Sequence, residues 1–112
     1  MNTLSTHVLD TSLGQPAAGI RVTLERVGIV EHPTVGGGTT DTNGRLTDIV
    51  APNALSAATY RLRFDVAQYF ARTGRATLFP EVAVVFVVGA GDEHYHIPVL
   101  LSPFGYTTYR GS

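Results

Sequence analysis

Few side chains in this sequence are suited to chemistry. The chain has no cysteine and no lysine, and its nine acidic residues form no cluster. Catalysis or ligand binding must therefore draw on histidine, arginine, serine and tyrosine. His94 and His96 lie two positions apart, which puts both imidazoles on one face of a strand. The chain ends in Tyr-Arg-Gly-Ser directly after a predicted strand, an ending that can bring a carboxylate, a hydroxyl and a guanidinium together.

The two neighbouring histidines first suggest a metal site. Zinc is held by three or four ligands drawn from cysteine, histidine and carboxylates. His94 and His96 come with no spaced carboxylate and no third imidazole. The sequence therefore predicts no metal site.

Taken singly, each candidate residue has a plainer interpretation. His7 and His96 would more often be structural or surface histidines of a strand. His32 in a loop and His94 at the start of a strand are typical of solvated side chains. Arg45 follows a turn, where an arginine is usually an exposed charge. A site is indicated only if several of these residues converge.

The composition indicates one domain over residues 1–112. A chain of 112 residues is close to the common domain size and can bury roughly two thirds of its unfolded surface. Without cysteine it forms no disulfides, so packing or subunit contacts must stabilise it.

Charge and hydropathy disfavour nucleic-acid and membrane partners. Eight basic and nine acidic residues give a formal net charge of −1, without the clustered basic residues of a nucleic-acid groove. The longest apolar run is far below the roughly 20 residues that span a bilayer, and the first six residues lack the features of a signal peptide. We expect a cytoplasmic protein.

The elements that must position the candidate residues are strands. Residues 94–101 alternate, with an apolar face opposite the face that carries His94 and His96. Residues 3–9 alternate as well and place His7 on the more polar face. After a turn at 102–105, a last strand follows.

The rest of the chain completes an all-β pattern. Further strands are predicted at 20–27 and 59–64, and 81–88 should be a central strand because it is almost continuously β-branched. Asp65 can cap one short helix over 66–73. Seven or eight short strands and one helix predict a two-sheet antiparallel β-sandwich.

Two glycine-containing segments lie between these elements. Gly36-Gly37-Gly38 should be flexible. Asn43-Gly44 is a strong signal for a β-hairpin because both residues tolerate positive φ.

Several segments together resemble the 5-hydroxyisourate hydrolases, the transthyretin-related enzymes of urate breakdown. The matching segments occur in the family's order over nearly the whole chain: Ser5 to Thr11 with Gly14 and Pro16-Ala17, Thr42-Asn43-Gly44-Arg45, Tyr95-His96-Ile97-Pro98, Leu101-Ser102-Pro103, and Tyr109-Arg110-Gly111-Ser112. Each is short, but jointly they are specific, and the terminal tetrapeptide is the most telling.

The resemblance implies a transthyretin-like sandwich, assembled as a homotetramer (a dimer of dimers) whose central channel holds the active sites at subunit interfaces. It implies no cofactor and no metal. The family's catalytic residues correspond to His7, Arg45, His96 and Ser112. Substrate-binding roles fall, by the same resemblance, on His7, Arg45, Tyr109, Arg110 and Gly111.

The family reaction opens the ring of 5-hydroxyisourate by attack of water on a cyclic amide carbonyl. A histidine, with an ordinary pKa near 6.5, is suited to take the proton of the water; the sequence leaves open whether His7 or His96 does so. Arg45 would stabilise the oxyanion, Tyr109 would flank the substrate, and the Ser112 end would orient a histidine.

Two alternatives remain at this point. A carrier in the manner of transthyretin would use the same channel without turnover, although a carrier is not expected to have His7, Arg45, His96 and this ending. A plain interaction sandwich would leave that coincidence unexplained.

Overall fold

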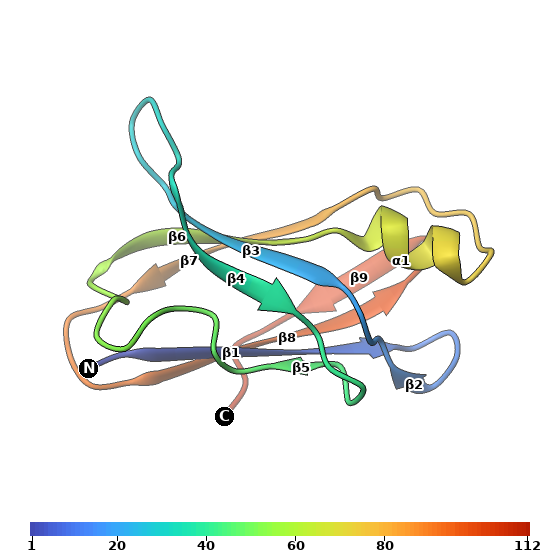
Figure 1. Ribbon diagram of the computed structural model, residues 1–112, viewed down its shortest axis with the longest axis horizontal. Coiled ribbons are helices and arrows are strands. Elements are labelled where there is room, and N and C mark those ends of the chain that lie inside the picture. Colours follow the sequence, from blue (N-terminus) through green and yellow to red (C-terminus); the bar gives the residue numbers. More distant parts are fainter.

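The chain folds into two β-sheets packed face to face, with one short helix at an end of the sandwich (Figure 1). The computed structural model describes all residues, Met1–Ser112. The elements are β1 (Thr3–Asp10), β2 (Gln15–Pro16), β3 (Arg21–Arg26), β4 (Thr34–Thr39), β5 (Arg45–Leu46), β6 (Ala58–Phe64), α1 (Val66–Arg72), β7 (Val82–Val88), β8 (His94–Ser102) and β9 (Gly105–Thr108). The predicted all-β sandwich with one helix is confirmed.

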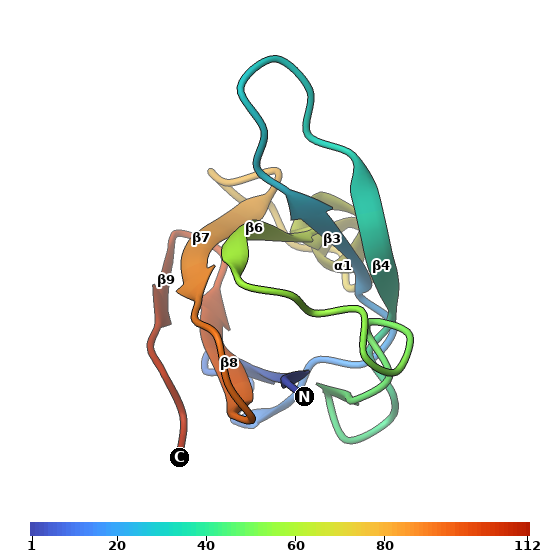
Figure 2. The ribbon, with the colours of Figure 1, turned by 90° about the vertical axis from the view of Figure 1, so that its left-hand side faces the viewer.

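Strands that follow one another in the chain do not always belong to the same sheet. One has the order β2-β1-β8-β9, with β5 also paired to β1, and the other has the order β4-β3-β6-β7. Figure 2 shows the two layers from one end. All pairs are antiparallel except β1 and β8, which run parallel. The predicted antiparallel sandwich thus contains one parallel pair, whose parallel course requires a long crossover. The second sheet lies within that crossover.

The core lies between the sheets and is built by alternation. Twenty buried hydrophobic residues form one cluster. In β6 the alternate residues Tyr60, Leu62 and Phe64 are at most 2% exposed. The apolar faces of β1 and β8 are buried as predicted, so their opposite, polar faces point out of the sandwich.

Helix α1 is fixed at both ends. The Asp65 carboxylate accepts a hydrogen bond from the Gln68 N–H at 3.4 Å, as the predicted N-cap should. Gly74 follows the last turn with a φ of +69°, a conformation in which glycine carries no penalty. The helix is too short to cross a membrane, and the chain contains no other.

Three predictions about the strands need correction. The segment 81–88 does form a strand, β7, but it lies at the edge of its sheet. The glycines 36–38 belong to β4: the Gly37 N–H donates to the Ile49 carbonyl at 2.8 Å, and a Cβ on Gly36 would lie 2.1 Å from that oxygen. Glycine is needed there because the loop after β5 lies directly on the strand.

The third correction concerns the Asn43-Gly44 turn. It joins β4 of one sheet to β5 of the other, so it is a crossing between sheets and forms no hairpin. Only Gly44 has a positive φ, +73°, and a Cβ there would lie 2.4 Å from the Val8 carbonyl oxygen. The glycine therefore allows the turn to approach β1 closely.

Candidate active site

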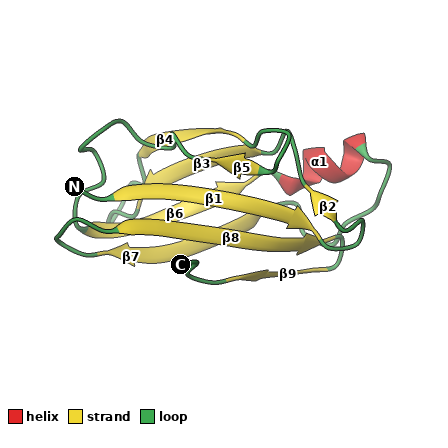
Figure 3. Cartoon of the chain, turned by 90° about the horizontal axis from the view of Figure 1, so that it is seen from below, coloured by secondary structure: helices red, strands yellow, loops and turns green.

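Two strand pairings bring the predicted catalytic side chains to the outer face of the β1–β8 sheet. The register of β1 and β5 sets His7 opposite Arg45, and that of β1 and β8 sets Ser5 opposite His96. Cross-strand neighbours lie on the same face of a sheet. Figure 3 views the molecule from this side and shows β1 and β8 next to each other.

The crossing turn places Arg45. The Asp41 carboxylate accepts hydrogen bonds from the N–H groups of Asn43 at 2.8 Å and Arg45 at 3.0 Å, and these bonds, the Arg45 bond first, hold the pKa of Asp41 below its usual value. The Gly44 carbonyl then accepts from the Val8 N–H at 2.8 Å. A short polar turn thus fixes the backbone of Arg45 opposite His7.

His96 lies partly buried in this group. Its Nδ1 is 2.7 Å from the Ser5 hydroxyl. Burial lowers the pKa of His96 below its ordinary value, and the nearby charges of His94, Arg45 and His7 lower it further. A neutral imidazole next to a guanidinium can accept a proton while the guanidinium stabilises a developing negative charge.

The C-terminal tail packs on His96. The Gly111 N–H donates to the His96 carbonyl at 2.8 Å, and a Cβ on Gly111 would lie 2.4 Å from Cδ2 of the imidazole. The tail can run this close only because residue 111 has no side chain. Ser112 follows Gly111 and is exposed. Tyr109 is exposed as well and lines a cleft with Arg110 and Tyr95 that contains no histidine.

Arg110 lies apart from the histidines. Its guanidinium stacks 4.7 Å from the centre of the Tyr95 ring and forms an ion pair with Glu93 at 3.4 Å. Both partners come from the segment at the start of β8. The structure thus brings together His7, Arg45, His96 and Gly111, whereas the Arg110 guanidinium binds the tail to β8 and its preceding loop.

Sequence reasoning missed two members of the group. His94 and Ser5 make hydrogen bonds in line with His96, and the His94 and His96 rings are 6.5 Å apart and nearly parallel. The signal for His94 was its spacing of two from His96, and that for Ser5 was its spacing of two from His7. His32 lies far along the chain in the β3–β4 loop, where its Nδ1 accepts from the Gly28 N–H at 3.1 Å.

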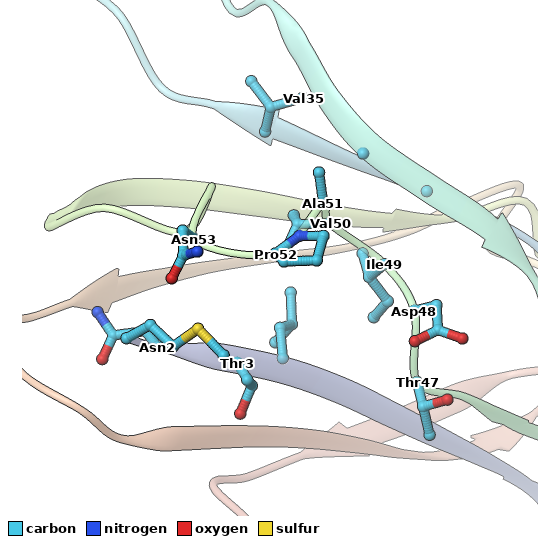
Figure 4. A pocket seen from close by; sticks show the side chains of 14 residues that line it. Asn2, Thr3, Val35, Thr47, Asp48, Ile49, Val50, Ala51, Pro52 and Asn53 are labelled. Atoms are coloured by element: carbon cyan, nitrogen blue, oxygen red, sulfur yellow. The ribbon is translucent and has the colours of Figure 1, made fainter.

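In the single chain, His7, His94 and His96 (the histidine group) lie on a sheet face that nothing covers opposite them. The cleft with the largest volume, about 560 Å³, lies elsewhere, between the first residues of β1, β4 and the loop 47–53 (Figure 4). It contains no histidine and no arginine, and none of the chain's clefts is lined by His7, Arg45 or His96. No three His, Cys, Asp or Glu side chains of the chain form a group that could hold a metal ion.

The fold and this outer face define the class: a transthyretin-like β-sandwich with imidazoles and a guanidinium on its β1–β8 sheet. Residues 4–111 match the model of the HIUase/Transthyretin family, and a 5-hydroxyisourate hydrolase of Salmonella typhimurium is 41% identical over 111 residues, which cover 99% of this chain and 82% of the relative. The chain therefore belongs to the HIUase/Transthyretin family.

Two solved structures represent the two branches that the family's name joins. The 5-hydroxyisourate hydrolase of Klebsiella pneumoniae is 40% identical, with a TM-score of 0.86 and coverage of 98% of this chain and 99% of that one. Sea bream transthyretin, solved with thyroxine, is 28% identical, with a TM-score of 0.91 and coverage of 97% and 94%. The backbone alone fits both branches, so the side chains must separate them.

Proposed function

We propose that the chain hydrolyses 5-hydroxyisourate to 2-oxo-4-hydroxy-4-carboxy-5-ureidoimidazoline in the breakdown of urate. The observation that carries this proposal is the convergence of His7, Arg45 and His96 on one sheet face, with the tail packed on His96. The relatives from Salmonella and Klebsiella, about equally similar, bear the name of this hydrolase. A relative from Arabidopsis thaliana, 42% identical over 125 residues, is named a bifunctional protein of uric acid degradation.

In the proposed mechanism a histidine takes a proton from the attacking water. His96 is the better candidate because its lowered pKa keeps the imidazole neutral at pH 7. Arg45 carries a permanent charge and stabilises the oxyanion that forms on the cyclic amide carbonyl. His7, paired with Arg45, binds the substrate and assists proton transfer. No metal or cofactor takes part in the proposed reaction.

The tail completes the proposed site. The Ser112 hydroxyl orients a histidine, and Tyr109 and Gly111 border the substrate. For Arg110 the proposal is indirect: its ion pair with Glu93 and its stacking on Tyr95 hold the tail in place.

The proposed assembly is a homotetramer, a dimer of dimers in the cytoplasm. The histidine group lies on open sheet surface in one chain, and a second sheet facing it would enclose a planar substrate and exclude water. A single chain could offer only one wall of such a site.

A direct assay tests the function. Fresh 5-hydroxyisourate is generated from urate with urate oxidase, the protein is added, and the decay of the substrate's ultraviolet band is followed against the spontaneous decay. Catalysed decay is expected. Unchanged decay together with a stable complex with an iodinated phenol would instead assign the chain to carriers of the transthyretin kind.

A further inference from the structure

Four side chains form one continuous hydrogen-bonded row across the site. The Thr3 hydroxyl is 2.6 Å from Nδ1 of His94, the Ser5 hydroxyl is 2.9 Å from Nε2 of His94, and the same hydroxyl is 2.7 Å from Nδ1 of His96. The parallel register of β1 and β8 creates the row, since it sets Thr3 opposite His94 and Ser5 opposite His96. Both imidazoles are thereby linked through one serine.

A serine hydroxyl has a single proton to donate. When both rings are neutral, the Ser5 hydroxyl can donate to at most one of its two nitrogen partners, so at least one of the two nitrogens must donate to it. If Nε2 of His94 accepts from Ser5, Nδ1 of His96 must therefore donate, so the protonation of His94 constrains that of His96. Three arrangements use all three contacts.

In one arrangement His96 carries its proton on Nε2. The Thr3 hydroxyl then donates to Nδ1 of His94, Nε2 of His94 donates to Ser5, and Ser5 donates to Nδ1 of His96. In the second arrangement every donor and acceptor is exchanged: Nδ1 of His96 donates to Ser5, Ser5 donates to Nε2 of His94, and Nδ1 of His94 donates to Thr3. In the third, Nδ1 of His96 and Nε2 of His94 both donate to Ser5, and the Thr3 hydroxyl donates to Nδ1 of His94. Nε2 of His96 has a free lone pair in the second and the third, in which Nδ1 of His96 donates to Ser5.

We propose that Ser5 and His94 are positioning residues that fix His96 in the tautomer protonated on Nδ1, so that its Nε2 is free to accept a proton. This inference rests on the proposed function for its direction, because a general base needs the free lone pair. Neither residue touches substrate in this role; both act through the ring of His96. The tautomer of a histidine is commonly set by the partner of its other ring nitrogen.

The burial of the row supports a fixed arrangement. Ser5 is only 7% exposed, so water cannot readily replace either imidazole as its partner. Thr3 and His94 are exposed, which leaves the outer end of the row in contact with solvent. The charges near His96 come from His94 in its own strand, Arg45 in β5 and His7 in β1, and a hydrogen bond to the Ser5 backbone opposes their lowering of its pKa.

The test reads the tautomer directly, without substrate. Imidazole nitrogen shifts of ¹⁵N-labelled protein distinguish the two neutral tautomers at a pH where His96 is uncharged. We expect His96 protonated on Nδ1 in the unsubstituted protein, and a mixed or reversed tautomer in Ser5→Ala and in His94→Ala. Ser102→Ala and His32→Ala are matched controls, because Ser102 bonds only the Gly105 carbonyl and His32 lies in the β3–β4 loop. The controls should leave the His96 shifts unchanged.

Kinetics provide the second readout. Ser5→Ala and His94→Ala should each lower kcat by roughly 10- to 100-fold, part of the 10²- to 10⁴-fold that a positioned base supplies, while KM changes little. His94 is exposed, so its variant tests the inference even if the buried Ser5 variant folds poorly. An Nε2-protonated His96 in the unsubstituted protein, or an unchanged His96 tautomer in both variants, would overturn the inference. Absence of hydrolysis by the unsubstituted protein would instead overturn the proposed function. The nitrogen shifts would still show whether Ser5 and His94 set the tautomer of His96.

Discussion

Strand β1 carries two polar groups that differ in almost every respect. At its end, the fully buried Asp10 accepts hydrogen bonds from Tyr69 at 2.7 Å and from Arg75 at 2.5 Å. Near its start, Ser5 links the imidazoles of His94 and His96 on the outer face. The first group pairs opposite charges, and the second gathers groups that are neutral or positive.

Electrostatics separate the roles of the two groups. Burial opposes ionisation of Asp10, but the hydrogen bonds from Arg75, Tyr69 and Ser12 outweigh it and hold the pKa of the carboxyl well below its usual range. Burial and the Asp10 hydrogen bond raise the pKa of Tyr69 to about 12. No charge in this group changes near neutral pH, so the group stabilises the fold. In the other group, burial lowers the pKa of His96, which keeps its imidazole neutral and able to accept a proton.

The largest expected effect is a loss of activity when residues of the outer group, the one around His96, are replaced. His7→Ala, Arg45→Ala and His96→Ala should each lower kcat/KM by about 10²- to 10⁴-fold, because each removes a proton acceptor or the stabilising charge. Thermal midpoints should barely change, since none of the three side chains is fully buried. Turnover against 5-hydroxyisourate and thermal unfolding measure the two effects, with His32→Ala as the control. Near-normal turnover in two of the three variants would refute the assignment.

The next largest effect is a loss of stability when the inner group, the one around Asp10, is altered. Asp10→Asn should lower the free energy of unfolding by about 3 kcal/mol, because the partly buried Arg75 loses its counter-charge. Denaturant titration at pH 7 measures this loss. The contribution of Asp10 is present above the ordinary carboxyl pKa of about 3.9 and is lost as pH falls, since its folded pKa is lower. The difference in the free energy of unfolding between the variant and the unsubstituted protein should therefore become smaller at acidic pH. A difference that does not change with pH would indicate a packing effect.

A smaller effect is expected from one methyl group on the tail. Gly111→Ala places a Cβ 2.4 Å from Cδ2 of His96, so the tail or the ring must shift. We expect kcat/KM to fall by about tenfold or more, because a small displacement of a catalytic group commonly has an effect of this size. The free energy of unfolding should change little. Gly105→Ala is the matched control: its Cβ would meet nothing closer than 3.7 Å. Equal activity of the two variants would show that the tail does not constrain His96.

The smallest effect is a displacement of the pH profile. Burial first, and then the charges of His94, Arg45 and His7, lower the pKa of His96. If His96 is the base, kcat/KM should be constant near pH 7 and should fall only as pH drops below the ordinary histidine value of about 6.5. A decline that already begins above that value would assign the base to another residue.

The sequence predicted what local patterns determine. Alternation in 3–9 and 94–101 placed His7 and His96 on outward faces, and the Asp65 cap located the helix. It misjudged what depends on partners distant in the chain: the edge position of β7, the packing of a loop on Gly36 and Gly37, and the course of the turn before Arg45. Whether a strand is central or at an edge is decided by which other strands reach it, and composition alone does not reveal this.

The same distinction explains the candidate site. His7, Arg45 and His96 were identified through a resemblance, since each alone has an ordinary interpretation. His94 was predicted to be solvated because it begins a strand, and it is indeed exposed. Its contact with Ser5 depends on the register between β1 and β8, and a slip of one residue would turn every side chain of the strand to the other face.

The parallel contact of β1 with β8 also has a kinetic consequence. Ser5 and His96 are 91 residues apart, so a long stretch of the polypeptide must close into a loop before they meet. Pairings this distant in the chain slow folding because loop closure must precede any gain from contact. Activity should therefore emerge late during refolding, after most of the secondary structure has formed, and a chain that stalls before β8 docks would be compact but inert.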